Sequence, residues 1–372
     1  DAIANLTFRL DDRNRIDFFS YGSYDNSQIA DLSTFTYHNA GASLSWTNLF
    51  RKKNSAAVSL IYNRYGLGEQ NMEYPMEAYK RSFILHHSEL RGSVTLRPAA
   101  AHTVDLGMNG ILYHASKGDL LPYNETSTII PESYEPEKGL ETAIYAGDEW
   151  KLSPRFSVNG GLRYTIYSYL GPKTVYDYIP GLPVEPVNIT DTLHYGSNAF
   201  IKTYDGLDYR LGATYLLTDQ LSVKGSYNRL HQYLFLLSNT IAVAPTDTWK
   251  LCDSHIKPMT GDQYTLGMYT FLLGEMYELS LEGYYKNVRN LVEYKDGADL
   301  VEADLTETEV IQGDLDSYGI EFMLKKAYGK FSGWVNYTYS RALVLANNPL
   351  TGEMNNFGEV YPANFDKPHS FN

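Results

Sequence analysis

The 372-residue sequence predicts an all-β protein, a transmembrane antiparallel up-and-down β-barrel with short periplasmic turns and long extracellular loops. Three observations predict this fold: short and long reversals alternate along the chain, the segments between them are long, and those segments alternate apolar with polar residues. A chain that turns briefly at one end and at length at the other has two ends in different surroundings. Outer-membrane barrels show this asymmetry.

Seven tight turns alternate with seven long loops. The tight turns are residues 11–14, 51–54, 98–101, 153–154, 218–220, 273–275 and 326–330. The long loops are residues 25–36, 66–78, 117–137, 171–204, 235–258, 295–312 and 345–365. Fourteen strands therefore precede Asp366, and residues 366–372 are expected to open a fifteenth. An open edge in hydrocarbon leaves backbone groups unpaired, so this odd, interrupted count predicts part of a larger barrel.

Strand length separates this pattern from that of a soluble β protein. Strands in globular domains have a mode of about 5–6 residues, whereas a strand tilted across a bilayer needs about 9–11. The segments 55–65, 155–170, 220–233 and 276–289 reach or exceed that length. We expect the excess to project beyond the membrane.

Alternation along residues 156–166 shows the two faces of such a strand. One face is apolar: Phe156, Val158, Leu162, Tyr164 and Ile166. The other is polar: Ser157, Asn159, Arg163 and Thr165. We expect the apolar face to meet lipid and the polar face to line a wet interior. Leu162→Arg should then cost about 2–4 kcal/mol, and Thr165→Arg should be tolerated.

Tyrosine is the commonest aromatic residue, with 33 Tyr against 15 Phe and 4 Trp. Many lie near expected strand ends: Tyr62, Tyr65, Tyr113, Tyr164, Tyr167, Tyr169, Tyr284, Tyr285, Tyr337 and Tyr339. An amphipathic ring suits the membrane–water boundary, which predicts an aromatic girdle. The alternative is the ordinary preference of Tyr for strands.

Composition excludes several other classes of protein. No run of 18 apolar residues exists, so helical membrane spans are not expected. The single Cys252 excludes a disulfide framework and a Cys-based metal site. A net charge of −13 argues against a nucleic-acid partner. We expect no cofactor. No signal peptide is visible, and Asp1 is not a natural start, so the numbering is expected to begin inside a longer chain.

Candidate ligand-binding residues lie in the long loops and at their strand ends. We predict ligand contacts from eight side chains: Tyr123, Tyr134, Tyr178, Tyr195, His231, Tyr233, Trp249 and His255. Aromatic rings anchor ligands because they bury much area at little entropic cost. The alternatives are loops that fold on themselves through these rings and, for His231, a solvated rim histidine.

The sequence does not identify a metal site, and its only candidate is an acidic stretch. One loop and the strand after it are acidic: Asp296, Asp299, Glu302, Asp304, Glu307, Glu309, Asp314 and Asp316. Clustered carboxylates could hold calcium, which takes 6–8 oxygen ligands, or simply be solvated. No Ser–His–Asp order, phosphate-binding loop or pair of catalytic carboxylates is found, so no enzymatic activity is expected.

Blocks of sequence carry a family resemblance. They include residues 141–167 (ETAIYAGDEWKLSPRFSVNGGLRYTIY), 209–233 (YRLGATYLLTDQLSVKGSYNRLHQY), 257–268 (KPMTGDQYTLGM), 281–287 (LEGYYKN), 318–325 (YGIEFMLK), 333–341 (GWVNYTYSR) and 361–372 (YPANFDKPHSFN). In this order they resemble the barrel of TonB-dependent outer-membrane receptors of the Bacteroidetes type. The resemblance covers nearly the whole chain.

The resemblance implies about 14–15 of 22 strands, with residues 1–372 forming a single partial barrel domain that lacks the plug and the final strands. It also implies TonB-coupled uptake of a scarce nutrient, such as a siderophore, cobalamin, haem or glycan, across the outer membrane of a Gram-negative bacterium. The implied partners are TonB through the missing plug, the small nutrient ligand, outer-membrane lipid and a surface lipoprotein.

Three alternatives stay open. A passive, porin-like diffusion channel predicts closure between the first and fourteenth strands, with acidic and basic residues facing each other across an inward-folded loop. An outer-membrane enzyme needs a catalytic cluster on the strand rims. A soluble adhesin needs a second sheet over the apolar face.

Overall fold

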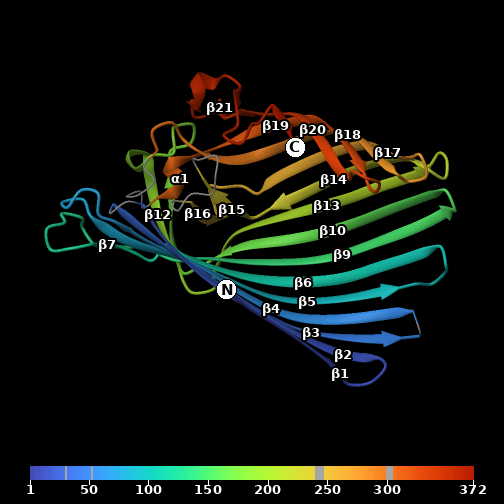
Figure 1. Cartoon of the computed structure of the whole chain (residues 1–372). Helices are drawn as coiled ribbons and strands as arrows, with labels where there is room; N and C mark the ends of the chain where they lie inside the picture. The colour runs from blue at the N-terminus through green and yellow to red at the C-terminus, as the bar shows by residue number, and fades with distance from the viewer. Residues whose placement is uncertain (30–31, 52, 239–246, 299–304) are drawn as a thin grey trace.

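The computed structural model describes residues 1–29, 32–51, 53–238, 247–298 and 305–372. Figure 1 shows a single curved sheet in which the tight turns all lie at one end and the loops at the other. Its long strands, in chain order, are β1 (Ala2–Arg9), β2 (Asn14–Ile29), β3 (Ser33–Phe50), β4 (Asn54–Asn71), β5 (Tyr79–Leu96), β6 (His102–Ser116), β9 (Glu137–Ser153), β10 (Phe156–Leu170), β13 (Phe200–Leu216), β14 (Leu221–Gln232), β17 (Met259–Leu272), β18 (Tyr277–Tyr294), β19 (Val310–Lys326) and β20 (Gly333–Leu345).

Each long strand pairs antiparallel with the next, which makes an up-and-down meander. The predicted fifteenth strand is present as β24 (His369–Phe371), which pairs with β20. The all-β antiparallel fold and the seven tight turns are therefore confirmed. Within the described residues, no ladder joins β1 to β20, so the closure that a fourteen-stranded porin requires is not formed.

Several loops are shorter than predicted because the strands continue into them. The predicted loop 25–36 is mostly a ladder, with Asp25 opposite Tyr37 and Ile29 opposite Ser33. The predicted loop 66–78 is likewise paired as far as Asn71. Beyond a membrane a ladder needs no apolar face, because the backbone bonds form whatever the side chains are.

The remaining loops contain short elements. These are β7 (Asp119–Pro122), β8 (Glu132–Ser133), β11 (Lys173–Tyr178), the 3-10 turn η1 (Pro186–Asn188), β12 (Ile189–Tyr195), β15 (Leu234–Leu237), β16 (Thr248–Leu251), α1 (Thr306–Glu309), β21 (Asn347–Asn348), β22 (Glu353–Met354), η2 (Asn356–Gly358) and β23 (Tyr361–Pro362). None of the helices in the described part of the chain has the length and apolarity needed to cross a membrane.

The outer face of the sheet, defined as the side that carries Leu162, is apolar and uncovered. Cross-strand pairing aligns Leu6, Phe18, Leu44, Leu60 and Leu90 in one row over five strands. Leu162 itself is 53% exposed. No described residue forms a second sheet over this face, so the soluble sandwich is not the fold, and the exposed apolar surface is what a lipid-facing wall requires.

The inner face, defined as the side that carries Thr165, is covered at its loop end. Thr165 is 1% exposed and Tyr167 is fully buried. The described parts of the segment between β14 and β17, residues 233–238 and 247–256, fold inward and pack on this face, against Ile111 and Val310 among others. The expectation that Thr165→Arg is tolerated is therefore wrong, because protein rather than water lies over that position.

The predicted girdle divides between the two faces. Tyr62, Tyr164 and Tyr285 are exposed on the sheet surface, as interfacial rings should be. Three other tyrosines of the set are buried: Tyr113, Tyr167 and Tyr169. Those three face inward and form the floor of the packed loop. Position near a strand end therefore did not decide which face a ring occupies.

Candidate functional site

A cavity of about 240 Å³ lies between the loops at the covered end of the sheet. Most of its lining comes from the loop after β6, the β11 strand, the segment around β16 and the α1 turn, and single residues of β5, β6, β9 and β10 complete it. The rings of Tyr134, Tyr169 and Trp249 line it together with His255 and Glu307. Most of the other lining residues are polar or charged, so the cavity is more polar than the mainly apolar sites that usually bind small molecules.

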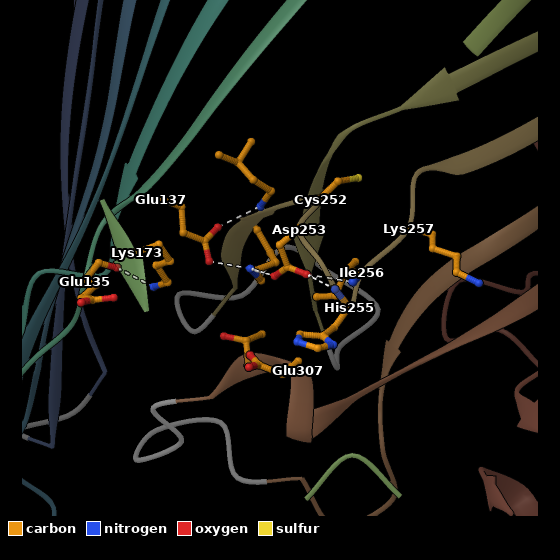
Figure 2. Close-up of polar contacts among 12 residues, drawn as sticks. Glu135, Glu137, Lys173, Cys252, Asp253, His255, Ile256, Lys257 and Glu307 are labelled. Carbon is orange, nitrogen blue, oxygen red and sulfur yellow. Dashed lines mark hydrogen bonds and ion pairs between the residues drawn. The ribbon is translucent and has the colours of Figure 1, made fainter. Parts of the chain in front are cut away.

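A buried ion-pair triad holds one wall in place. Lys250 of β16 places its Nζ 2.5 Å from Glu137 Oε1 and 2.5 Å from Asp253 Oδ2. The Lys250 ammonium also lies over the ring of Tyr169, 5.8 Å from its centroid. Because Glu137 begins β9 and Lys250 belongs to the inward-folded segment, this triad fastens the segment to the barrel wall (Figure 2).

Two members of the triad, Asp253 and Lys250, have shifted pKa values. Burial by itself would raise the pKa of Asp253, but the Lys250 ammonium and the N–H groups of Ile256 and His255 outweigh it and hold that pKa below its ordinary value. Burial by itself would lower the pKa of Lys250, but Asp253 and Glu137 outweigh it and raise that pKa. Both groups therefore stay charged at neutral pH, as a buried pair must to be stable.

Tyrosine side chains of the sheet hold the same segment through further contacts. The Tyr167 hydroxyl donates to the carbonyl of Cys252 at 2.8 Å, and the Tyr204 hydroxyl donates to the carbonyl of Asp253 at 2.7 Å. Tyr233 stacks on Tyr167 with ring centroids 5.0 Å apart. The segment is thus part of the packed interior of the barrel rather than an exposed loop.

A second group of polar side chains lies at the cavity, with Glu307 and His255 in its lining and Tyr178 packed beside them. The Tyr178 hydroxyl donates to Glu307 at 3.3 Å, and burial together with Glu307 raises the pKa of Tyr178. Tyr178 also meets the His255 ring edge-on at 5.2 Å. The Nε2 atom of His255 is buried and has no hydrogen-bond partner among the described residues. Figure 2 shows His255 and Glu307 facing the same space, while Lys257 points away.

The charges of the cavity are mixed. Lys173 donates to the carbonyl of Glu135 at 3.1 Å, and the carboxylate of Glu135 accepts the N–H of Thr174 at 2.8 Å. Lys117 donates to Thr306 at 2.7 Å. The cavity therefore offers both signs of charge beside aromatic rings, which suits a ligand with several polar groups on a partly apolar body.

The described residues contain no group of three His, Cys, Asp or Glu side chains that could hold a metal ion. Of the acidic loop proposed for calcium, Asp299, Glu302 and Asp304 lie outside the described residues. Glu307 contacts Tyr178, and Asp316 accepts hydrogen bonds from Tyr285 and Asn287 within the sheet. The described carboxylates are thus dispersed among separate contacts.

The structure brings together some of the predicted ligand residues. Tyr134, Trp249 and His255 line the cavity. Tyr178 does not line it but packs against the ring of His255. Tyr233 is instead buried in the packed segment.

The other three predicted residues lie apart from the cavity lining. His231 pairs with Asp208 at 2.7 Å. Tyr195 lies in the β11–β12 hairpin opposite Lys173, and Tyr123 is an exposed loop residue. A role in ligand binding remains a prediction for all eight.

Sequence reasoning missed the Lys250 triad. Lys250 and Asp253 are three residues apart, which is a weak local signal, but Glu137 lies 113 residues away along the chain. Nothing in the sequence around Glu137 indicates that a distant loop returns to it.

Comparisons with known proteins agree with this architecture. Residues 2–372 match the family described as TonB dependent receptor-like, beta-barrel. None of the curated proteins matches the chain significantly. The family and the similar structures are receptors and transporters rather than enzymes, and they do not favour the passive porin.

Three solved structures illustrate the likeness. The ferric-catecholate import receptor Fiu from K12 E. coli has a TM-score of 0.63 and 13% identity over 99% of this chain and 60% of its own. The Serratia marcescens hemophore receptor HasR has a TM-score of 0.63 and 12% identity over 98% of this chain and 58% of its own. The ferric citrate transporter FecA has a TM-score of 0.63 and 12% identity over 96% of this chain and 53% of its own. At these identities the likeness concerns the fold, and the chain spans 60% or less of each.

Proposed function

Because the chain belongs to the TonB dependent receptor-like β-barrel family, we propose that it forms much of the wall and recognition surface of a receptor for energised nutrient uptake. The observation that carries this proposal is the match of residues 2–372, supported by the uncovered apolar face around Leu162. In this proposal the receptor lies in the outer membrane of a Gram-negative bacterium, with outer-membrane lipid against that face.

The proposal divides the work between this chain and the rest of the receptor. We assign residues 1–372 to a single partial barrel domain. The plug, through which TonB would act, is assigned to the part of the receptor that this chain does not span. Uptake then needs both parts, while first contact with the nutrient uses the loops described above.

The cavity beside Trp249 and His255 is the proposed contact point for the nutrient. Its rings would stack on a conjugated or saccharide surface, and its charged groups would hydrogen-bond polar substituents. Siderophore, cobalamin, haem and glycan all meet this description. The mixed charge and the net charge of −13 give no support for a nucleic-acid ligand. A surface lipoprotein is a further proposed partner at the loop end.

Uptake by cells tests the proposal. A strain that lacks the full-length receptor is complemented with the wild-type gene and supplied with single ferric siderophores, haem, cyanocobalamin or oligosaccharides. We expect uptake of one class to depend on the gene and to stop when TonB is deleted. Uptake that continues without TonB would indicate a passive channel, and no dependence on the gene for any class would contradict nutrient uptake.

Point variants test the cavity separately. Trp249→Ala and His255→Ala, made in the full-length receptor, should each weaken binding of the accepted nutrient by about tenfold or more, as removal of a central contact residue does. Tyr74→Ala is the matched control, because Tyr74 is an exposed loop aromatic that neither lines the cavity nor belongs to the eight predicted ligand residues. Equal affinities in all three variants would place recognition elsewhere.

A further inference from the structure

Four strands of the outer face carry ordered rows of side chains between the loop end and the turn end. The row nearest the loops is polar: Arg229, Asp262, Asn287 and Asp316. The next row is aromatic: Tyr227, Tyr264, Tyr285 and Tyr318. The third row alternates small and large residues: Gly225, Leu266, Gly283 and Ile320. The fourth is apolar: Val223, Met268, Leu281 and Phe322.

The third row forms the floor of a groove of about 800 Å³ on this face. The groove exists because two of its floor positions are glycine. A Cβ added at Gly283 would come no closer than 3.9 Å to the carbonyl oxygen of Gly319, and one added at Gly225 no closer than 3.9 Å to Leu266. The space above both glycines is therefore open. Glycine inside a strand often marks a place where another molecule approaches closely.

Hydrogen bonds orient two tyrosines of the aromatic row beside the groove. The Tyr227 hydroxyl donates to Asp262 at 2.7 Å, and the Tyr285 hydroxyl donates to Asp316 at 2.5 Å. Tyr227 and Tyr264 stack with ring centroids 4.8 Å apart. The rings thus present their apolar bodies to the groove, while their hydroxyl groups point toward the polar row and the loops.

The charges beside the groove are already satisfied within the protein. Arg229 binds Asp262 through two hydrogen bonds of 2.8 Å, and Asn287 donates to Asp316 at 2.9 Å. The row keeps one net negative charge, on Asp316, which accepts hydrogen bonds only from the neutral Tyr285 and Asn287 and would not attract an anionic headgroup. The groove is therefore suited to an uncharged, flexible and apolar occupant.

We propose that this groove binds one acyl chain of a lipid in the leaflet next to the loops. The proposal rests on the membrane placement given above. Arg229 is four positions after Gly225, which is about 13 Å along the strand. The groove thus lies on the acyl side of the tyrosine row, and the polar row lies at headgroup level, the order that a membrane boundary imposes.

Filling the groove tests the proposal. The full-length receptor and its Gly225→Leu/Gly283→Leu variant are purified from outer membranes in a mild detergent, and the lipid that remains bound is measured by native mass spectrometry. The matched control is Gly110→Leu, another outward glycine, where an added Cβ would come no closer than 3.9 Å to Thr142. Heat-dependent gel mobility checks that all three fold.

We expect the filled variant to retain lipid about tenfold less than wild type, which corresponds to about 1.4 kcal/mol, and the control to match wild type. Equal retention by all three proteins, or an equal fall in both variants, would overturn the groove. Failure of the wild-type receptor to insert into vesicles would overturn the membrane placement as well. Insertion without a difference between the variants would overturn the groove alone.

Discussion

The two faces of β10 lie in opposite surroundings although their residues alternate along one strand. Leu162 points outward and is 53% exposed, whereas Thr165 points inward and is 1% exposed. A sheet with an apolar face and a polar face would normally bury the apolar one. Here the polar face is the buried one at the loop end, because a loop returns to cover it, and the apolar face is left uncovered. The comparison teaches that alternation identifies two faces but not what covers each.

The largest expected effect is at the triad that fastens the returning loop. Lys250→Ala should cost about 3–5 kcal/mol of docking stability, because it leaves the buried Glu137 and Asp253 carboxylates unpaired. Hydrogen exchange at the amides of Leu251, His255 and Ile256 measures this, since all three donate to those carboxylates. Lys250→Met combined with Glu137→Gln and Asp253→Asn should recover part of the protection. Unchanged exchange in Lys250→Ala would show that the triad does not hold the loop.

The second-largest expected effect is a loss of folding stability from a charge on the outward face. Leu162→Arg should destabilise the folded barrel by about 2–4 kcal/mol, because a charge in the hydrocarbon is poorly solvated. Asn159→Arg is the control, since Asn159 lies on the same strand, faces inward and is exposed. Urea titration in lipid vesicles compares them. Equal midpoints would mean that the outward face does not meet lipid.

The covered part of the inner face should respond differently from its open part. Thr165→Arg should cost about 1–3 kcal/mol through overpacking, which forces the segment around Tyr233 away from the strand. Unlike Leu162→Arg, it should act on loop docking and leave membrane insertion intact. Hydrogen exchange and vesicle insertion, measured on the same samples, separate the two effects. Loss of insertion in Thr165→Arg would contradict this division.

The smallest expected effect is that of pH, because the docking of the loop should not change with pH near neutrality. Because the pKa of Asp253 is lowered below its ordinary 3.8, its contribution to docking is complete above that value and is lost as the pH falls through the folded pKa. Because the pKa of Lys250 is raised above 10.5, its contribution is complete below that value and is lost as the pH rises further. Exchange of the Ile256 amide, corrected for its intrinsic rate, should be constant from about pH 5 to about pH 9. A transition inside that range would assign the docking to another group.

Local sequence patterns were enough to predict the meander, the positions of all seven tight turns, the fifteenth strand and the outward placement of residues such as Leu162. Those features follow from local chemistry: turn residues, a period of two and strand length act over a few neighbours. Three of the eight predicted ligand residues also line the cavity, because aromatic loop residues gather wherever loops pack.

No local sequence pattern predicted what lies over the inner face. The burial of Thr165 and Tyr167 and the Lys250–Glu137 pair all depend on one loop returning to strands about a hundred residues earlier. Its course is set by the summed packing of many side chains rather than by any local pattern. The Gly225–Gly283 groove is likewise a product of strand register, which places two distant glycines in one row.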